Sequence, residues 1–241
     1  MGLFFLVTLV VQGAFFLSVF FLAGGTRDAA RRIVAMGATC GNVGFFGIPV
    51  VQNIFPDSPE VACYAICYTL SMNLLVFTLG IFCLTGDKKY ISLRAALCNP
   101  SMFGLAIGLP IYLLGLSDNL PALAETGIRT LGGLTTPLCM FILGIRLAAT
   151  PVKRLFCKGK VYAVLGLKLV IYPLICWAIS RLLPLDAAFK GCLTLLSATP
   201  CAAIILSMAE IHKSETETSA ACILVSTLLC VVTIPLFALM I

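Results

Sequence analysis

Long apolar stretches alternate with short polar segments along the whole chain. Crossing a hydrocarbon layer of about 30 Å takes about 20 apolar residues in a helix. Dividing the chain at charged residues and at clusters of proline and glycine predicts eight spans, at 2–24, 33–55, 61–84, 97–116, 126–149, 160–183, 188–211 and 219–241. The first span lacks the basic start and the cleavage site of a signal peptide, so we interpret it as a membrane span. The pattern predicts an all-α polytopic membrane protein.

Composition and charge agree with a chain whose solvent is the bilayer. Of the 241 residues, 61% are hydrophobic and 11% are charged, which excludes an ordinary soluble domain. The net charge of +6 could suggest a nucleic-acid partner, but no basic patch with interleaved aromatic residues occurs. We therefore expect no nucleic-acid partner.

Most of the basic residues lie in loops that the spans place on one side of the membrane. They are Arg27, Arg31, Arg32, Lys88, Lys89, Arg94, Arg146, Lys153, Arg154, Lys158, Lys160 and Lys213. Because basic loops stay in the cytoplasm, this distribution predicts a multi-pass protein of the cell membrane with both termini outside.

The chain offers little for metal, cofactor or enzyme chemistry. Its 12 cysteines lie mostly inside apolar stretches and are best interpreted as small hydrophobic residues. The single histidine, His212, falls in a polar loop. No Ser/His/Asp, Cys/His or Glu/His set converges at one depth, so we expect no cofactor, no metal site and no enzymatic activity.

An internal repeat organises the spans. The three spans in 1–84 correspond to the three in 160–241 at an offset of about 155 to 158 residues, and segment 71–81 aligns without gaps on 226–236. The two sets run in opposite directions, which predicts inverted repeats. The pair of spans in 97–149 precedes the second set, and the same offset would put its counterpart upstream of Met1. We therefore expect eight spans of a ten-span protein, with inverted five-helix repeats.

Two corresponding spans carry residues that interrupt helices. Clustered glycine weakens a helix, and proline removes a backbone donor. The span 33–55 contains Gly37, Gly41, Gly44, Gly47 and Pro49 around Asn42, and the span 188–211 contains Thr199 and Pro200. We predict that both helices break near the middle of the membrane, with Gly44, Gly47 and Pro49 at the first break. For Gly37 and Gly41 alone, a close-packing face between helices is the alternative.

Broken helices suit a polar ligand, because helix ends present oriented donors and partial charge. The candidate substrate-binding residues are Gly41, Asn42, Asn73, Thr199 and Pro200. Lys168 is expected to extend toward the cytoplasmic face, or else to provide a counter-charge for an anion. No pair of carboxylates falls at mid-membrane, which disfavours ion coupling through buried aspartate.

Five stretches carry a resemblance to a known family. GNVGFFGIPV (41–50) resembles the signature of the auxin efflux carrier family, and four further stretches follow in family order, at 99–109, 131–148, 198–210 and 226–236. The resemblance implies a ten-helix fold with two crossing broken helices, at which Asn42 and Pro200 mark the site. It implies a transport domain from 1–84 and 160–241, scaffold helices in 97–149 that allow a homodimer, and transport of small organic anions such as mono- or dicarboxylates.

Three hypotheses remain open from the sequence. The first is a facilitative or proton-driven carrier of small carboxylates that works by alternating access. The second is a sodium-coupled symporter of similar broken-helix architecture. The third is a non-transporting, truncated membrane remnant. The sequence does not identify the anion, the direction of transport or the coupling ion.

Overall fold

A computed structural model describes the protein over residues 1–24, 29–80, 82, 100–116, 121–148, 159–211, 213 and 215–241. Within these ranges the elements are helical, and the only β pairing is one isolated bridge. The prediction of an all-α protein is confirmed for this part of the chain.

Most of the helices follow the predicted spans. The α-helices are α1 (Gly2–Leu22), α2 (Ala29–Thr39), α3 (Ile48–Ile54), α4 (Glu60–Leu75), α7 (Pro100–Leu113), α8 (Ala122–Ala148), α10 (Gly159–Gly166), α11 (Tyr172–Leu182), α12 (Ala187–Ser197), α13 (Ile204–Ile211) and α14 (Thr216–Ala238). Three π-helical turns continue neighbouring helices, namely η2 (Val43–Gly47), η3 (Val76–Gly80) and η6 (Leu167–Ile171).

Four continuous helices in the described ranges are long and apolar enough to cross a membrane. They cover Gly2–Leu22, Glu60–Gly80, Gly159–Leu182 and Thr216–Ala238. Helices α7 and α8 lie within or beside the predicted spans 97–116 and 126–149. The predicted spans 33–55 and 188–211 are each interrupted by a non-helical segment, which leaves shorter half-helices on either side.

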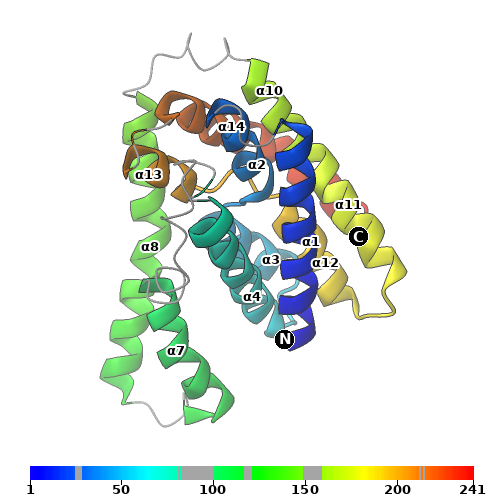
Figure 1. The fold of residues 1–241 in the computed structure, drawn as a ribbon. Coiled ribbons are helices and arrows are strands. Elements are labelled where there is room, and N and C mark those ends of the chain that lie inside the picture. The colour runs from blue at the N-terminus through cyan, green and yellow to red at the C-terminus, as the bar shows by residue number, and fades with distance from the viewer. Residues whose placement is uncertain are drawn as a thin grey trace.

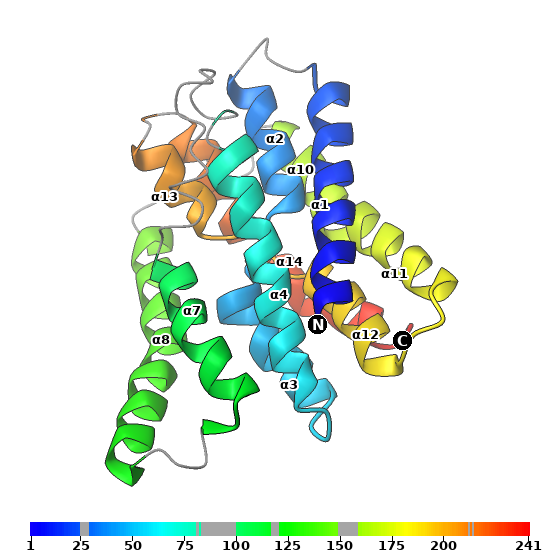
Figure 2. The ribbon, with the colours of Figure 1, turned by 60° about the horizontal axis from the view of Figure 1, so that its bottom comes forward.

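The half-helices are arranged in an antiparallel manner. Figures 1 and 2 show α2 and α13 toward one end of the molecule, and α3 and α12 toward the other. Helices α7 and α8 stand together at one side, where α8 contacts η2 and α14. The interruptions therefore meet in the middle of the main body of helices.

Stacked rings and close backbone approach hold the main body together. Between membrane helices the attraction comes from packing rather than from the hydrophobic effect. The ring centroids of Phe4 and Tyr64 are 4.6 Å apart, and those of Phe15 and Tyr172 are 4.5 Å apart. A Cβ atom added at Gly37 would lie 2.8 Å from Val164 Cγ1, so Gly37 lets α2 approach α10 closely. For Gly37, the close-packing alternative is the one observed.

Several predicted features lie outside the described residues. They are the span boundaries at 81, 83–84, 97–99 and 149, the basic loop residues Arg27, Lys88, Lys89, Arg94, Lys153, Arg154 and Lys158, and His212.

Candidate functional site

The two interrupted helices pair with each other through their non-helical segments. Gly41 and Cys201 form an antiparallel bridge. The Asn42 amide donates to the Pro200 carbonyl at 2.7 Å, and the Ala202 amide donates to the Cys40 carbonyl at 3.0 Å. Inside a bilayer, backbone groups freed by a helix break need a partner within the protein. Each interruption provides partners for the other, and we call this paired region the crossing (residues 40–42 and 198–203).

Helix α14 is hydrogen-bonded to the crossing through Ser226. The Cys201 amide donates to Ser226 Oγ at 2.9 Å, and Ser226 Oγ donates in turn to the Ile223 carbonyl at 3.0 Å. Proline at position 200 has no amide hydrogen, so its carbonyl is the group that it contributes to the pairing. The crossing thus contains a short two-stranded pairing where regular helices would normally satisfy the backbone.

Gly41 is required at the crossing by space. A Cβ atom at this position would collide with Thr199 Oγ1 and would lie 2.9 Å from Lys168 Nζ. The predicted residues Gly41, Asn42, Thr199 and Pro200 are therefore brought together, from segments that are far apart in the sequence. Thr199 is fully buried, and its hydroxyl donates to the Leu196 carbonyl at 2.7 Å.

The first break lies before the residues predicted to cause it. The helix ends at Thr39 and resumes at Val43, whereas Gly44 and Gly47 lie in η2 and Pro49 lies in the first turn of α3. Proline is tolerated in the first turn of a helix, and the preceding π-helical turn accommodates its missing donor. A Cβ atom at Gly47 would lie 3.0 Å from Leu196 Cδ2, so Gly47 serves packing against α12. Gly44, Gly47 and Pro49 thus lie just after the non-helical segment 40–42.

Lys168 does not extend toward the cytoplasmic face. Its side chain is fully buried, and its ammonium donates to the Ser197 carbonyl at 2.9 Å and to the Thr39 carbonyl at 3.5 Å. These two carbonyls end α12 and α2. The ammonium also lies 5.1 Å from the centre of the Tyr172 ring. The extended orientation expected from the sequence is wrong, and the Lys168 ammonium lies beside the crossing.

Two of the predicted site residues, Asn42 and Asn73, have side chains that are almost fully buried. Asn42, which precedes η2, is 6% exposed and makes no side-chain capping bond. Asn73 on α4 is 5% exposed. Among the described residues, the buried side-chain atoms without a hydrogen-bond partner are Gln12 Oε1, Thr39 Oγ1 and Thr233 Oγ1. The side-chain atoms of Asn42 and Asn73 are not among them.

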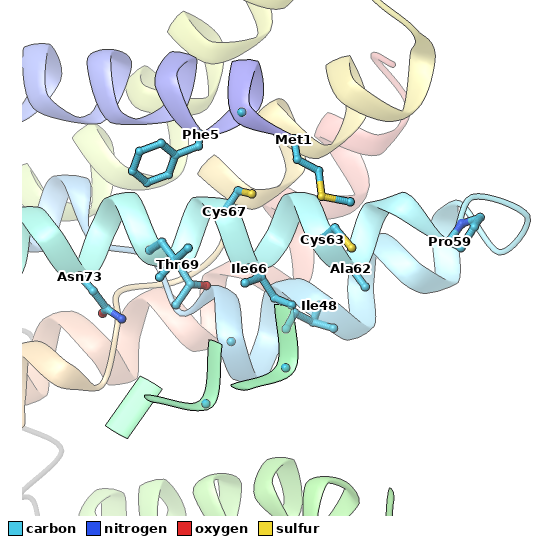
Figure 3. A pocket seen from close by; sticks show the side chains of 15 residues that line it. Met1, Phe5, Ile48, Pro59, Ala62, Cys63, Ile66, Cys67, Thr69 and Asn73 are labelled. Atoms are coloured by element: carbon cyan, nitrogen blue, oxygen red, sulfur yellow. The ribbon is translucent and has the colours of Figure 1, made fainter. Parts of the chain in front are cut away.

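A cavity of about 770 Å³ lies beside α4, within the range of sizes typical of ligand pockets. In Figure 3, Met1 and Phe5, from the start of the chain, lie on one side of α4, and Ile48 of α3 lies on the other. Of the labelled lining residues, Asn73 lies at one end of the cavity and Pro59 at the other. The predicted residues Gly44 and Asn73 line this cavity, whereas Gly41, Asn42, Thr199 and Pro200 do not. The cavity is mainly apolar, with Thr69 and Asn73 as polar side chains.

Sequence reasoning missed a hydrogen bond between tyrosines next to the crossing. The hydroxyl groups of Tyr68 and Tyr172 are 3.0 Å apart, and both side chains are fully buried. Position in an apolar helix gives no signal for such a pair. Nearby, Gln12 Nε2 donates to Ser71 Oγ at 2.8 Å and so joins α1 to α4.

Comparison with known proteins finds similarity to membrane transporters. A protein described as an uncharacterized transporter from Methanothermobacter thermautotrophicus (strain Delta H) is 28% identical to this chain over 224 residues, which cover 87% of this chain and 70% of the relative. A family profile described as "Membrane transport protein" matches residues 89–238, which is more than half of the 241 residues. The chain thus belongs to the membrane transport protein family, the auxin efflux carrier family that its sequence motifs resemble.

Proposed function

We propose that this membrane transporter is a secondary carrier that moves small organic anions by alternating access. The observation that carries the proposal is the crossing, where two interrupted helices pair and the Asn42 side chain, which is 6% exposed, makes no capping hydrogen bond. Two helical segments begin next to the crossing, at Val43 and at Ile204. Helix N-termini carry partial positive charge and free amide hydrogens, which suit a carboxylate.

The cavity beside α4 supports an anion with an apolar body. Its lining contains Phe5, Ile48 and Ile66, while Asn73 and Thr69 can contact a polar group. A ligand that places its carboxylate toward the crossing and its apolar part in the cavity would match both regions. Aromatic or aliphatic carboxylic acids have this form.

The arrangement of half-helices supports the inverted-repeat architecture that alternating access requires in related transporters. The chain runs into the crossing through α2 and leaves it through α13 at one end of the molecule. It runs in through α12 and leaves through α3 at the other end. In this proposal the interrupted helices move together past α7 and α8, which serve as the scaffold.

The experiment is uptake of radiolabelled benzoate by the purified protein in liposomes. We expect Asn42→Ala to abolish uptake because it removes the side-chain amide at the crossing. Asn53→Ala is the matched control, because Asn53 lies in the same interrupted helix, is exposed, and donates only to the Pro49 carbonyl of its own helix. Equal uptake by both variants, with normal membrane insertion, would show that the site assignment is wrong.

A further inference from the structure

Lys168 touches the two helix ends at the crossing that carry partial negative charge. Its ammonium donates to the Ser197 carbonyl at the end of α12 and to the Thr39 carbonyl at the end of α2. The lysine side chain reaches them from the π-helical turn η6, and π-helical turns often occur at functional positions. Lys168 thus joins both interrupted helices to the continuous helix that carries it.

No carboxylate among the described residues balances the ammonium. Between residues that the structure describes, the one salt bridge joins Arg129 to Glu125. Each helix C-terminus is equivalent to about half a negative charge. The two C-termini together therefore match the single positive charge of Lys168.

The two remaining helix ends at the crossing are N-termini, which Lys168 does not touch. The helical segments Val43–Ile54 and Ile204–Ile211 both begin there, and each N-terminus is equivalent to about half a positive charge. The residue that precedes the first of them is Asn42, whose side chain is 6% exposed and makes no capping hydrogen bond. The uncompensated charge amounts to about one positive unit.

We propose that Lys168 is a resident cation that cancels the two helix C-termini, so that the two N-termini bind a substrate with a single negative charge. This inference rests on the proposed function and specifies its substrate class as monocarboxylates, with dicarboxylates excluded. Because the lysine already occupies the place of a cation, binding requires no sodium ion. Lys168 acts on the substrate through the helix ends and is a positioning residue.

The first test compares uptake of benzoate and phthalate, which share a ring and differ by one carboxylate. In liposomes, the wild-type protein should take up benzoate at least about tenfold faster than phthalate, whether the buffer contains sodium or potassium. Lys168→Met, which keeps the length but removes the charge, should lower benzoate uptake by about tenfold or more. Lys190→Met is the matched control, since Lys190 is only partly buried near the start of α12.

A second measurement separates the resident cation from transport itself. Lys168→Ala removes the ammonium and leaves space, so the melting temperature of the purified variant should fall by roughly 5 °C or more and should recover with added propylammonium. In Lys168→Met the space is filled, so propylammonium should have no effect.

Each outcome distinguishes the two proposals. If the wild-type protein transports benzoate but Lys168→Met transports it equally well, or if phthalate is transported as fast as benzoate, the resident cation is ruled out and the carrier function stands. If the wild-type protein transports neither acid, the proposed function fails for this substrate class. In that case an unchanged melting temperature for Lys168→Ala, or a lack of response to propylammonium, would also reject the resident cation.

Discussion

Gly41 lies where the two interrupted helices pair, and its lack of a side chain is what lets them approach. A methyl group there would meet both Thr199 Oγ1 and Lys168 Nζ. We expect Gly41→Ala to abolish uptake of benzoate and to lower the melting temperature, because the crossing must open to admit the methyl group. Both quantities can be measured on the same purified protein.

The control for this substitution is Gly166→Ala. Gly166 ends α10, just before the turn that carries Lys168, and an added Cβ atom would have no atom within 4 Å. Alanine is also preferred over glycine in a helix by about 1 kcal/mol. Gly166→Ala should therefore keep both uptake and thermal stability. A Gly41→Ala variant that behaves like this control would contradict the packing described for the crossing.

Two features of single residues could not be predicted from the sequence, namely the position of the helix break and the orientation of Lys168. The motif around Asn42 indicated a break in the helix, but it could not distinguish Pro49 from Gly41. The position of the break depends on the hydrogen bond that the Asn42 backbone amide donates to the Pro200 carbonyl and on the one that the Ala202 amide donates to the Cys40 carbonyl. A lysine near a helix end can extend to the membrane surface or turn inward, and the sequence favoured the surface. Lys168 turns inward because it lies on the side of η6 that faces the crossing, where the Thr39 and Ser197 carbonyls accept its hydrogen bonds.

At the scale of elements, one hydrogen bond connects α4 to the start of α11 across the core. It joins the hydroxyl groups of Tyr68 and Tyr172 at 3.0 Å. We expect the variants Tyr68→Phe and Tyr172→Phe to be coupled by about 0.5–1 kcal/mol in the free energy of unfolding, as is typical for hydrogen bonds between membrane helices. A double-mutant cycle measured by denaturation in mixed micelles gives this value.

The control cycle combines Tyr172→Phe with Tyr64→Phe. Tyr64 lies on the same helix as Tyr68, but its ring stacks on Phe4 and its hydroxyl group makes no hydrogen bond to Tyr172. Coupling near zero is expected for this pair. Equal coupling in both cycles would mean that the measured energy comes from general packing and not from the hydroxyl contact.

Most elements could be predicted because apolar length is a local property of the chain. Helices α1, α4 and α14 follow the predicted spans within a few residues at the ends that are described. The π-helical turns could not be predicted, because they adjust helical register to neighbouring residues. At η6, this adjustment positions Lys168 against two carbonyls from other helices.

At the scale of the whole molecule, the cavity beside α4 should be accessible to reagents and to substrate. Cys63 and Cys67 line it and are partly exposed, whereas Cys176 and Cys201 are buried. N-ethylmaleimide should modify the first two thiols faster than the latter two. Saturating benzoate should slow this modification severalfold if the cavity receives the apolar part of the substrate.

Peptide mass spectrometry reports each cysteine separately and is the measurement of choice. Benzamide, which has the same ring without a charge, is the matched control and should protect Cys63 and Cys67 less well than benzoate. Protection that is equal for both compounds, or absent for both, would separate the cavity from the anion site.

The sequence also predicted the architecture of the whole molecule better than its details. Family motifs and two interrupted spans indicated a transporter with a central crossing, because both signals are carried by short segments. Apart from Gly44 and Asn73, the lining of the cavity beside α4 was not predicted, since α1, α3, α4 and α7 form it together. Its lining combines residues from Met1 to Gly108, and no spacing in the sequence relates them.

The pairing at the crossing also bears on how the protein is made. Its partners are remote in the chain, since Cys201 Sγ donates to the Gly37 carbonyl across 164 positions. While the ribosome is still producing the second half, the backbone groups of Cys40 and Asn42 therefore lack the partners that the finished protein gives them. Loops of this length close late in folding. The nascent first half would have to be shielded, by water, lipid headgroups or an insertion factor, until α12 and α13 enter the membrane.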